Sequence, residues 1–293
     1  MPGTIIHKAL LATLAVWLFG TSPVLAQELP HRKAKRVAVL PVQRLDIPCD
    51  RLFTPEQRED FDGRAIERSI QDSLARLPDV KLLSNQELRK RITGVPRYRD
   101  QVVIGRERYL MGHEYYRDLR QQDAETSLQK STAILENIYY DIVEPHAFSQ
   151  VLFLLGITLV EVSKAADAHQ IFKRALMLSP STSFTPGYHP QPVEQAMSVA
   201  CEDLRRSTAR EIPLTSIERT VRFMKHNKLS TLVYPVLIKE KDEHELLLIV
   251  FERSSRTVTF RQRLPMTDKK SNRERISRAI SGWAACEIGR AHV

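Results

Sequence analysis

The sequence predicts an α+β protein, in which an α/β domain of about five strands is split by an inserted all-α helical region. Short β-branched and aliphatic runs lie near both ends of the chain, and such runs are typical of buried strands. Residues 95–212 between them show amphipathic helical patterns with small residues at fixed places. Neither flank alone has enough strands and helices to cover both faces of a sheet. We therefore expect residues 27–94 and 213–287 to form two halves of one domain.

Residues 1–26 have the pattern of a secretory signal peptide. Lys8 precedes the apolar run 9–20, which is too short to span a bilayer comfortably. Residues 24–26 (Val-Leu-Ala) match a signal peptidase site, so we expect the mature chain to begin at Gln27. No cysteine lies at the cleavage point, which favours a soluble periplasmic or secreted protein over a lipoprotein. The alternative is that residues 1–26 remain as an uncleaved membrane anchor. No later segment is long and apolar enough to span a bilayer.

The first half of the α/β domain is expected to contain a strand at residues 36–42, a helix at 63–77, a strand at 80–84 and a short helix at 85–92. Ile66, Ile70 and Leu74 share one face of the longer helix, so that face should pack on a sheet. Ser84 can cap the shorter helix. Residues 43–61 contain no phosphate-binding glycine pattern and are predicted to form a loop.

The segment 151–180 carries a spaced set of packing residues, which are Leu152, Leu155, Gly156, Leu159, Ala168, Phe172, Ala175 and Pro180. Gly156 and Ala168 are small enough to let two antiparallel helices approach closely, while Phe172 fills the space between helical hairpins. Pro180 should end the second helix. This succession resembles the tetratricopeptide repeat, a helix-turn-helix unit of roughly 34 residues, although Leu152 stands where that family often has Trp or Tyr.

An upstream segment resembles a degenerate copy of the same repeat. It places Met111, Gly112, Tyr115, Ala124 and Leu128 at the corresponding positions, but a serine replaces the second alanine and no proline follows. The two glycines are 44 residues apart, so we expect residues 137–146 to lengthen the first pair's second helix or its connection. Residues 192–207 predict a capping helix, which a short repeat array needs because its last hairpin has no neighbour.

The second half of the α/β domain is expected to contain a helix at 217–228, strands at 229–240, 245–255 and 256–265, and a helix at 271–287. The order of elements in the two halves, together with the opening strand VAVLPV at 37–42, resembles the N-terminal α/β domain of TolB and related bacterial envelope proteins. Residues 288–293 (IGRAHV) resemble the translation of a common sequencing adapter, and we expect the natural sequence to differ beyond about Glu287.

The composition excludes several classes of function. The formal charge of +9 is scattered and not interleaved with aromatic residues, so no nucleic-acid partner is expected. Of Cys49, Cys201 and Cys286, two could form a disulfide, or all three could be packed or idle thiols. No Cys/His pattern with the spacing of metal ligands is present, and we expect no cofactor and no metal.

No catalytic constellation is expected either. His113 and Glu114 resemble the start of a zinc-protease motif, but Arg117 stands where the second histidine should be. No nucleophile-and-base spacing accompanies the other histidines. Tyr139 and Tyr140, and the loop 184–191, either anchor a partner or fill gaps between hairpins.

Repeat arrays bind on the concave face formed by their first helices, and this geometry makes Arg108, His113, Tyr116 and Gln150 candidate partner-binding residues. The sequence therefore predicts a non-enzymatic scaffold or adaptor that binds other envelope proteins through its repeats. The alternative is a periplasmic module that senses a small ligand or binds a glycan with its α/β domain.

Overall fold

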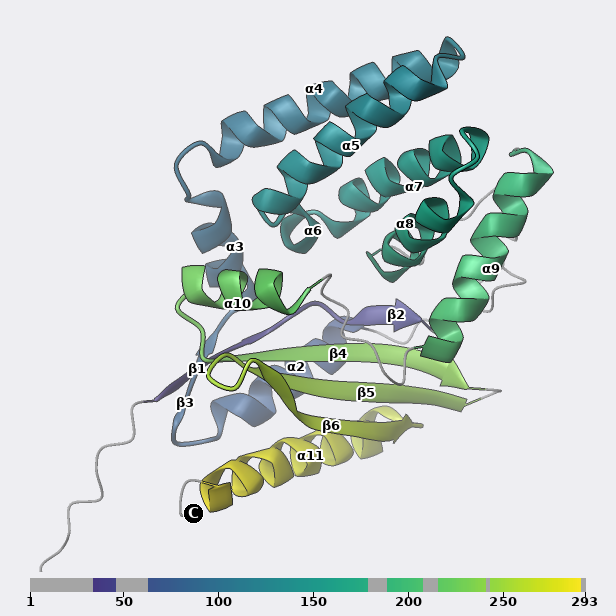
Figure 1. The fold of residues 1–293 in the computed structure, drawn as a ribbon. Helices are drawn as coiled ribbons and strands as arrows, with labels where there is room; N and C mark the ends of the chain where they lie inside the picture. The colour runs from purple at the N-terminus through teal and green to yellow at the C-terminus, as the bar shows by residue number, and fades with distance from the viewer. Residues whose placement is uncertain (1–33, 46–62, 179–188, 208–215, 241–242, 291–293) are drawn as a thin grey trace, which may run out of the picture. The chain divides into compact units, whose positions relative to one another are not determined.

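A computed structural model describes residues 34–45, 63–178, 189–207, 216–240 and 243–290 (Figure 1). The expected signal peptide, Pro180 and most of the loop 184–191 lie outside the described residues. The chain divides into two units, residues 1–34 and 35–293, and the elements described below belong to the second.

One mixed sheet contains strands from both ends of this unit, as expected for an α+β fold. Its strands are β1 (Lys35–Val39), β2 (Gln43–Leu45), β3 (Val80–Leu83), β4 (Thr231–Glu240), β5 (Glu243–Glu252) and β6 (Thr257–Met266). They lie in the order β3-β1-β4-β5-β6, and β2 also pairs with β4. Strand β1 runs parallel to β3 and β4, whereas β4, β5 and β6 are antiparallel neighbours. Strands that precede and follow the helical stretch therefore share backbone hydrogen bonds.

Strand β2 corrects the prediction that residues 43–61 form a loop. Val39 pairs with Val233, and Gln43 pairs with Val236, so β1 and β2 follow the same edge of β4 with one extra residue between them. Such an insertion is a β-bulge, and Pro41 lies within it. Proline has no backbone N–H, and at this position no hydrogen bond between the strands is lost. A three-residue strand is too short to show a hydrophobic period of its own.

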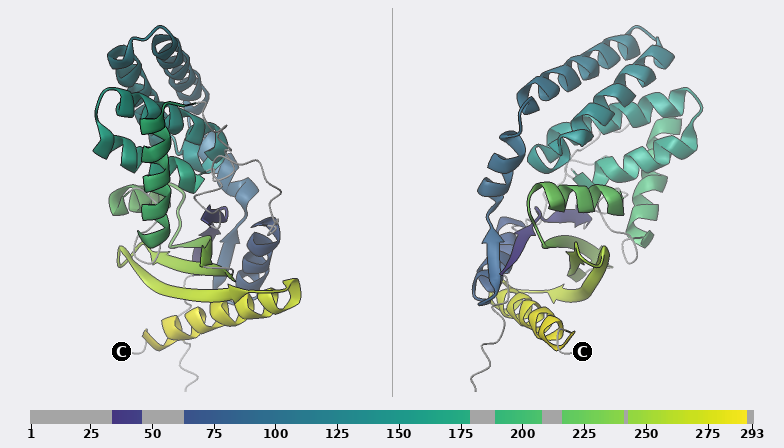
Figure 2. Two further views of the ribbon diagram at one scale, coloured as in Figure 1. Left: turned by 90° about the vertical axis from the view of Figure 1, so that its right-hand side faces the viewer. Right: turned by 60° about the vertical axis from the view of Figure 1, so that its left-hand side comes forward.

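Alternate residues of the sheet enter two cores. Val37, Val39 and Leu237 pack on one face with helices α2 (Gly63–Ala75) and α11 (Lys269–Arg290). Figure 2 shows α11 lying along this face. Ala38, Leu40 and other residues of the opposite face join a second core, which extends through α10 (Ile217–His226) into the helical stretch.

The helical stretch contains α3 (Asn85–Thr93), α4 (Tyr98–Arg117), α5 (Gln121–Asn137), α6 (Tyr140–Val143), α7 (Pro145–Glu161), α8 (Ala165–Leu178) and α9 (Gln191–Ser207). The Ser84 cap is confirmed, because Ser84 and Glu87 form a capping box at the start of α3. Helices α4 and α5 pack together, as do α7 and α8, and α5 contacts α7 (Figure 1). Helix α9 covers α8, as expected for a capping helix.

The two hairpins repeat the same backbone geometry at an offset of 44 residues. In the first turn Leu119 has a φ of 59°, and the N–H of Arg120 donates to the Tyr115 carbonyl at 2.8 Å. In the second turn Ser163 has a φ of 63°, and the N–H of Lys164 donates to the Leu159 carbonyl at 2.8 Å. Every one of these positions is 44 residues from its counterpart.

The glycines repeat in the same way. A Cβ atom added to Gly156 would lie 2.5 Å from the ring of Phe172, and one added to Gly112 would lie 2.6 Å from Cγ of Leu128. Both glycines therefore permit a close helix crossing that a larger residue would prevent. The extra length of the first unit lies in α5, which has 17 residues against 14 in α8, and in the short helix α6.

No helix among the described residues combines the length and the apolar character that crossing a membrane requires.

Candidate functional site

The four predicted partner-binding residues lie on the first helices of the hairpins but make contacts with other side chains. The Tyr116 hydroxyl donates to a Glu161 carboxylate oxygen at 2.9 Å, which links α4 to α7. Arg108 is half-buried, with Nη1 placed 3.9 Å from the sulfur of Met111. Tyr116 thus helps to hold the array together, whereas the Arg108 contact stays within α4.

His113 and Gln150 are the two exposed members of the predicted set. The His113 ring lies 6.5 Å from the Tyr109 ring, measured between centroids, and the Gln150 amide nitrogen lies 3.5 Å from Nε2 of His146. His146 and Gln150 are one helical turn apart on α7, so both occupy the same side of that helix. Both side chains are exposed on this side of α7.

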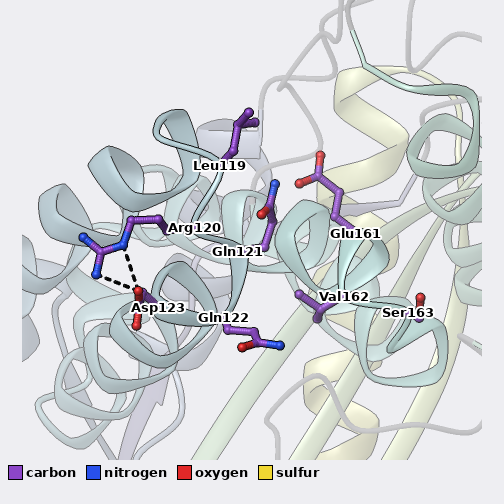
Figure 3. A pocket seen from close by; sticks show the side chains of 8 residues that line it. All are labelled: Leu119, Arg120, Gln121, Gln122, Asp123, Glu161, Val162 and Ser163. Carbon is purple, nitrogen blue, oxygen red and sulfur yellow. Dashed lines mark hydrogen bonds and ion pairs between the residues drawn. The ribbon is translucent and has the colours of Figure 1, made fainter.

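The structure adds a depression that the sequence did not reveal, between the tips of the two hairpins (Figure 3). It measures about 740 Å³ and is lined by Leu119, Arg120, Gln121, Gln122, Asp123, Glu161, Val162 and Ser163. Arg120 forms an ion pair with Asp123 at 2.7 Å, and its guanidinium stacks 4.4 Å from the Tyr115 ring centroid. The charged groups at this end therefore already have partners. The 44-residue offset between Gly112 and Gly156, which makes the two hairpin turns equivalent, is the sequence signal that could have located it.

Tyr139 and Tyr140 are buried, so the hypothesis that they anchor a partner is wrong. Tyr139 packs edge-on against Phe223 of α10 at 5.0 Å between ring centroids. The Tyr140 hydroxyl accepts a hydrogen bond from Arg106 at 2.8 Å. Both rings fill the space between the hairpins and the sheet, which was the other interpretation of these residues.

A buried ion pair connects α10 to the helical stretch close to these tyrosines. The two guanidinium nitrogens of Arg219 donate to the two carboxylate oxygens of Asp141 at 2.6 and 2.8 Å. Burial acts to lower the pKa of Arg219, but the hydrogen bonds and charge of Asp141 outweigh it and raise that pKa. The bidentate geometry fixes the position of α10 relative to α6.

A second charged cluster attaches the capping helix. Asp203 of α9 accepts a hydrogen bond from Lys173 at 3.0 Å, and Nε2 of His169 lies 3.0 Å from the same oxygen. The hydrogen bonds from His169 and Lys173 lower the pKa of Asp203. His169 thus serves in a contact between α8 and α9.

The cysteines differ in state. Cys201 of α9 is disulfide-bonded, whereas Cys286 of α11 is an exposed free thiol. The third cysteine, Cys49, lies outside the described residues.

The outer side of α4 is the remaining surface of interest. Val103 and Leu110 are 55% and 58% exposed there, and Ile104 and Met111 are also exposed. Met111, which occupies a packing position of the predicted repeat, is therefore among the exposed apolar residues of α4.

In the described part of the chain, no group of three or more His, Cys, Asp and Glu side chains is arranged to hold a metal ion. No protein-family model matches the sequence, and no curated protein or solved structure shows significant similarity to it.

Proposed function

We propose that this protein is a non-enzymatic adaptor of the bacterial cell envelope, and that it binds another envelope protein through tetratricopeptide-like hairpins in α4–α9. The observation that carries the proposal is the 44-residue repeat of turn and glycine geometry in the two hairpins. Stacked hairpins of one geometry form a continuous helical surface, and such surfaces bind extended segments or helices of partner proteins.

The exposed side of α7 is the best-supported part of this surface. Gln150 and His146 are exposed there, while the buried face of α7 packs on α5 and α8. Two hairpins and a cap offer a small interface, at or below about 1,200 Å², which favours weak and exchangeable binding. An adaptor that recruits partners in turn requires such binding.

Two observations support export from the cytoplasm. The leader has the pattern of a cleaved signal peptide, and Cys201 is disulfide-bonded, which is typical of an oxidising compartment. We further propose that the sheet and its helices are a TolB-like domain that presents the hairpins. Mass spectrometry of exported protein should find a chain beginning at Gln27, whereas an intact Met1 in washed membranes would indicate an anchored protein.

Site-specific photocrosslinking in cells tests the partner-binding proposal. A photoreactive residue at Gln150 or His146 should trap one discrete partner, identified by mass spectrometry, in the full-length protein. Ser254, an exposed residue of the turn between β5 and β6, is the matched control and should trap none.

Trapping at Ser254 alone would overturn this proposal and favour the alternative, a ligand-sensing or glycan-binding module that uses the sheet domain. Equal trapping at all three positions would show collisions without a defined surface, and it would also count against the adaptor.

A further inference from the structure

The outer side of α4 lies opposite the face that packs into the protein. Gly105 and Gly112 face α5, since a Cβ atom on either would lie 2.6 Å from a leucine of that helix. Successive residues of an α-helix are separated by about 100°, so Val103 and Leu110 project from the opposite side. Their exposed fractions of 55% and 58% agree with this placement. The first helix of the array therefore presents a narrow apolar seam to solvent.

Charged residues of opposite sign flank this seam on its two sides. The same helical geometry places Arg99, Arg106 and His113 along one side, and Asp100, Glu107 and Glu114 along the other. All six residues are exposed, and the guanidinium of Arg106 also hydrogen-bonds the Tyr140 hydroxyl. Each basic residue precedes an acidic residue by one position, so the two rows are level along the helix axis.

We propose that α4 pairs with α4 of a second copy of this chain in a parallel, two-fold symmetric homodimer. A two-fold axis parallel to the helices places the basic row of each copy against the acidic row of the other. Arg99 then lies level with Asp100 of the other copy, and His113 with Glu114. Val103 and Leu110 meet their own counterparts across the axis, which removes the seam from water.

The charge pattern excludes the antiparallel arrangement. A two-fold axis perpendicular to the helices would place the basic row against the basic row and the acidic row against the acidic row. Like charges in register disfavour association. A uniformly apolar or uniformly charged face would not have distinguished the two orientations, whereas rows of opposite sign on either side of the seam do.

The dimer should be weak and should depend on protein and salt concentration. Helix α4 has 20 residues, and at about 1.5 Å per residue it is roughly 30 Å long. One helix stripe of that length falls at or below the low end of specific interfaces, about 1,200 Å² in total. Its flanking ion pairs are exposed and screened by salt. This inference does not rest on the proposed adaptor function, because it concerns a different surface.

Charge reversal tests the orientation and the occupant together. Sedimentation equilibrium of the wild-type protein at low salt should show its molar mass rise toward that of two chains with concentration. The variant Arg99→Glu/His113→Glu and the variant Asp100→Lys/Glu114→Lys should each remain monomeric. Their equimolar mixture should associate again, because both flanks of the mixed pair then carry opposite charges. Arg106 is left unchanged because it hydrogen-bonds Tyr140, and circular dichroism verifies that the variants fold.

Cysteine crosslinking provides the second measurement, in a Cys286→Ser background that removes the exposed thiol. In the parallel dimer both Val103→Cys and Leu110→Cys lie on the symmetry axis, so both should form disulfide-linked dimers under mild oxidation. An antiparallel pair could link only one of them. Ile217→Cys, an exposed aliphatic position on α10, is the control and should not link.

A wild-type protein that stays monomeric at every concentration would overturn the proposal, as would a mixture of the charge variants that fails to associate. Efficient linking at one seam position and not the other would refute the parallel arrangement.

Discussion

Replacing Gly156 with alanine should destabilise the protein, although alanine is the better helix former. An added Cβ atom would lie 2.5, 2.8 and 2.9 Å from three ring atoms of Phe172, whose side chain is fully buried. Overpacking of this kind costs about 1–3 kcal/mol. The gain in helix propensity from glycine to alanine is about 1 kcal/mol. We therefore expect a net loss of roughly 0–2 kcal/mol in the free energy of unfolding.

Gly282 of α11 is the matched control, because a Cβ atom there meets nothing within 4 Å. Gly282→Ala should gain the full propensity term of about 1 kcal/mol, so the two variants should differ by about 1–3 kcal/mol. In a protein of this size each kcal/mol shifts Tm by roughly 2–4 °C, which helical circular dichroism resolves. Gly112→Ala, the equivalent change in the first hairpin, should behave like Gly156→Ala. Equal melting temperatures for Gly156→Ala and Gly282→Ala would refute the close crossing, and with it the repeat geometry.

Three further outcomes are expected. Arg219→Ala should cost about 3–5 kcal/mol in urea unfolding, because it leaves the buried Asp141 carboxylate without its partner; a loss below about 1 kcal/mol would contradict the bidentate pair. Backbone N–H groups at the start of α11 hold the pKa of Asp268 at about 2, below its ordinary 3.8. The stability of the wild type relative to Asp268→Ala should thus be complete above about pH 4 and decline as the pH falls toward 2; a difference that does not change with pH would refute this. Alkylation of denatured, unreduced protein should modify Cys286 alone, and a second adduct would mean that Cys201 is not in a disulfide.

Much of the fold follows from local sequence. Leu74 and the isoleucines preceding it predicted α2 and its buried face, and Ser84 predicted the start of α3. Gly156 was expected to lie at a close helix crossing, and a Cβ atom there would lie only 2.5 Å from the ring of Phe172. In each case the signal involves residues on the same helix or on consecutive helices, because periodicity, caps and turns depend on hydrogen bonds and neighbours within a few positions.

The candidate site was predicted less completely. The sequence placed Tyr116 and Gln150 on first helices but could not show that the Tyr116 hydroxyl binds Glu161, which lies 45 residues later. The sequence left open whether Tyr139 and Tyr140 anchor a partner or fill gaps between hairpins. Their burial depends on contacts distant in the chain: Tyr139 packs on Phe223 of α10, more than 70 residues later, and Tyr140 binds Arg106 of α4.

The sequence by itself determined which segments form helices and strands and where the helical hairpins turn, since these depend on contacts between residues close in the chain. The tertiary structure alone decided that Gln43–Leu45 is a strand, because its partner β4 lies almost 200 residues away. It also decided that Arg219 meets Asp141 across 78 residues. It left Val103 and Leu110 exposed while the opposite side of α4 was covered. Burial depends on which other segment reaches a surface, and the amphipathic pattern of one segment cannot specify that.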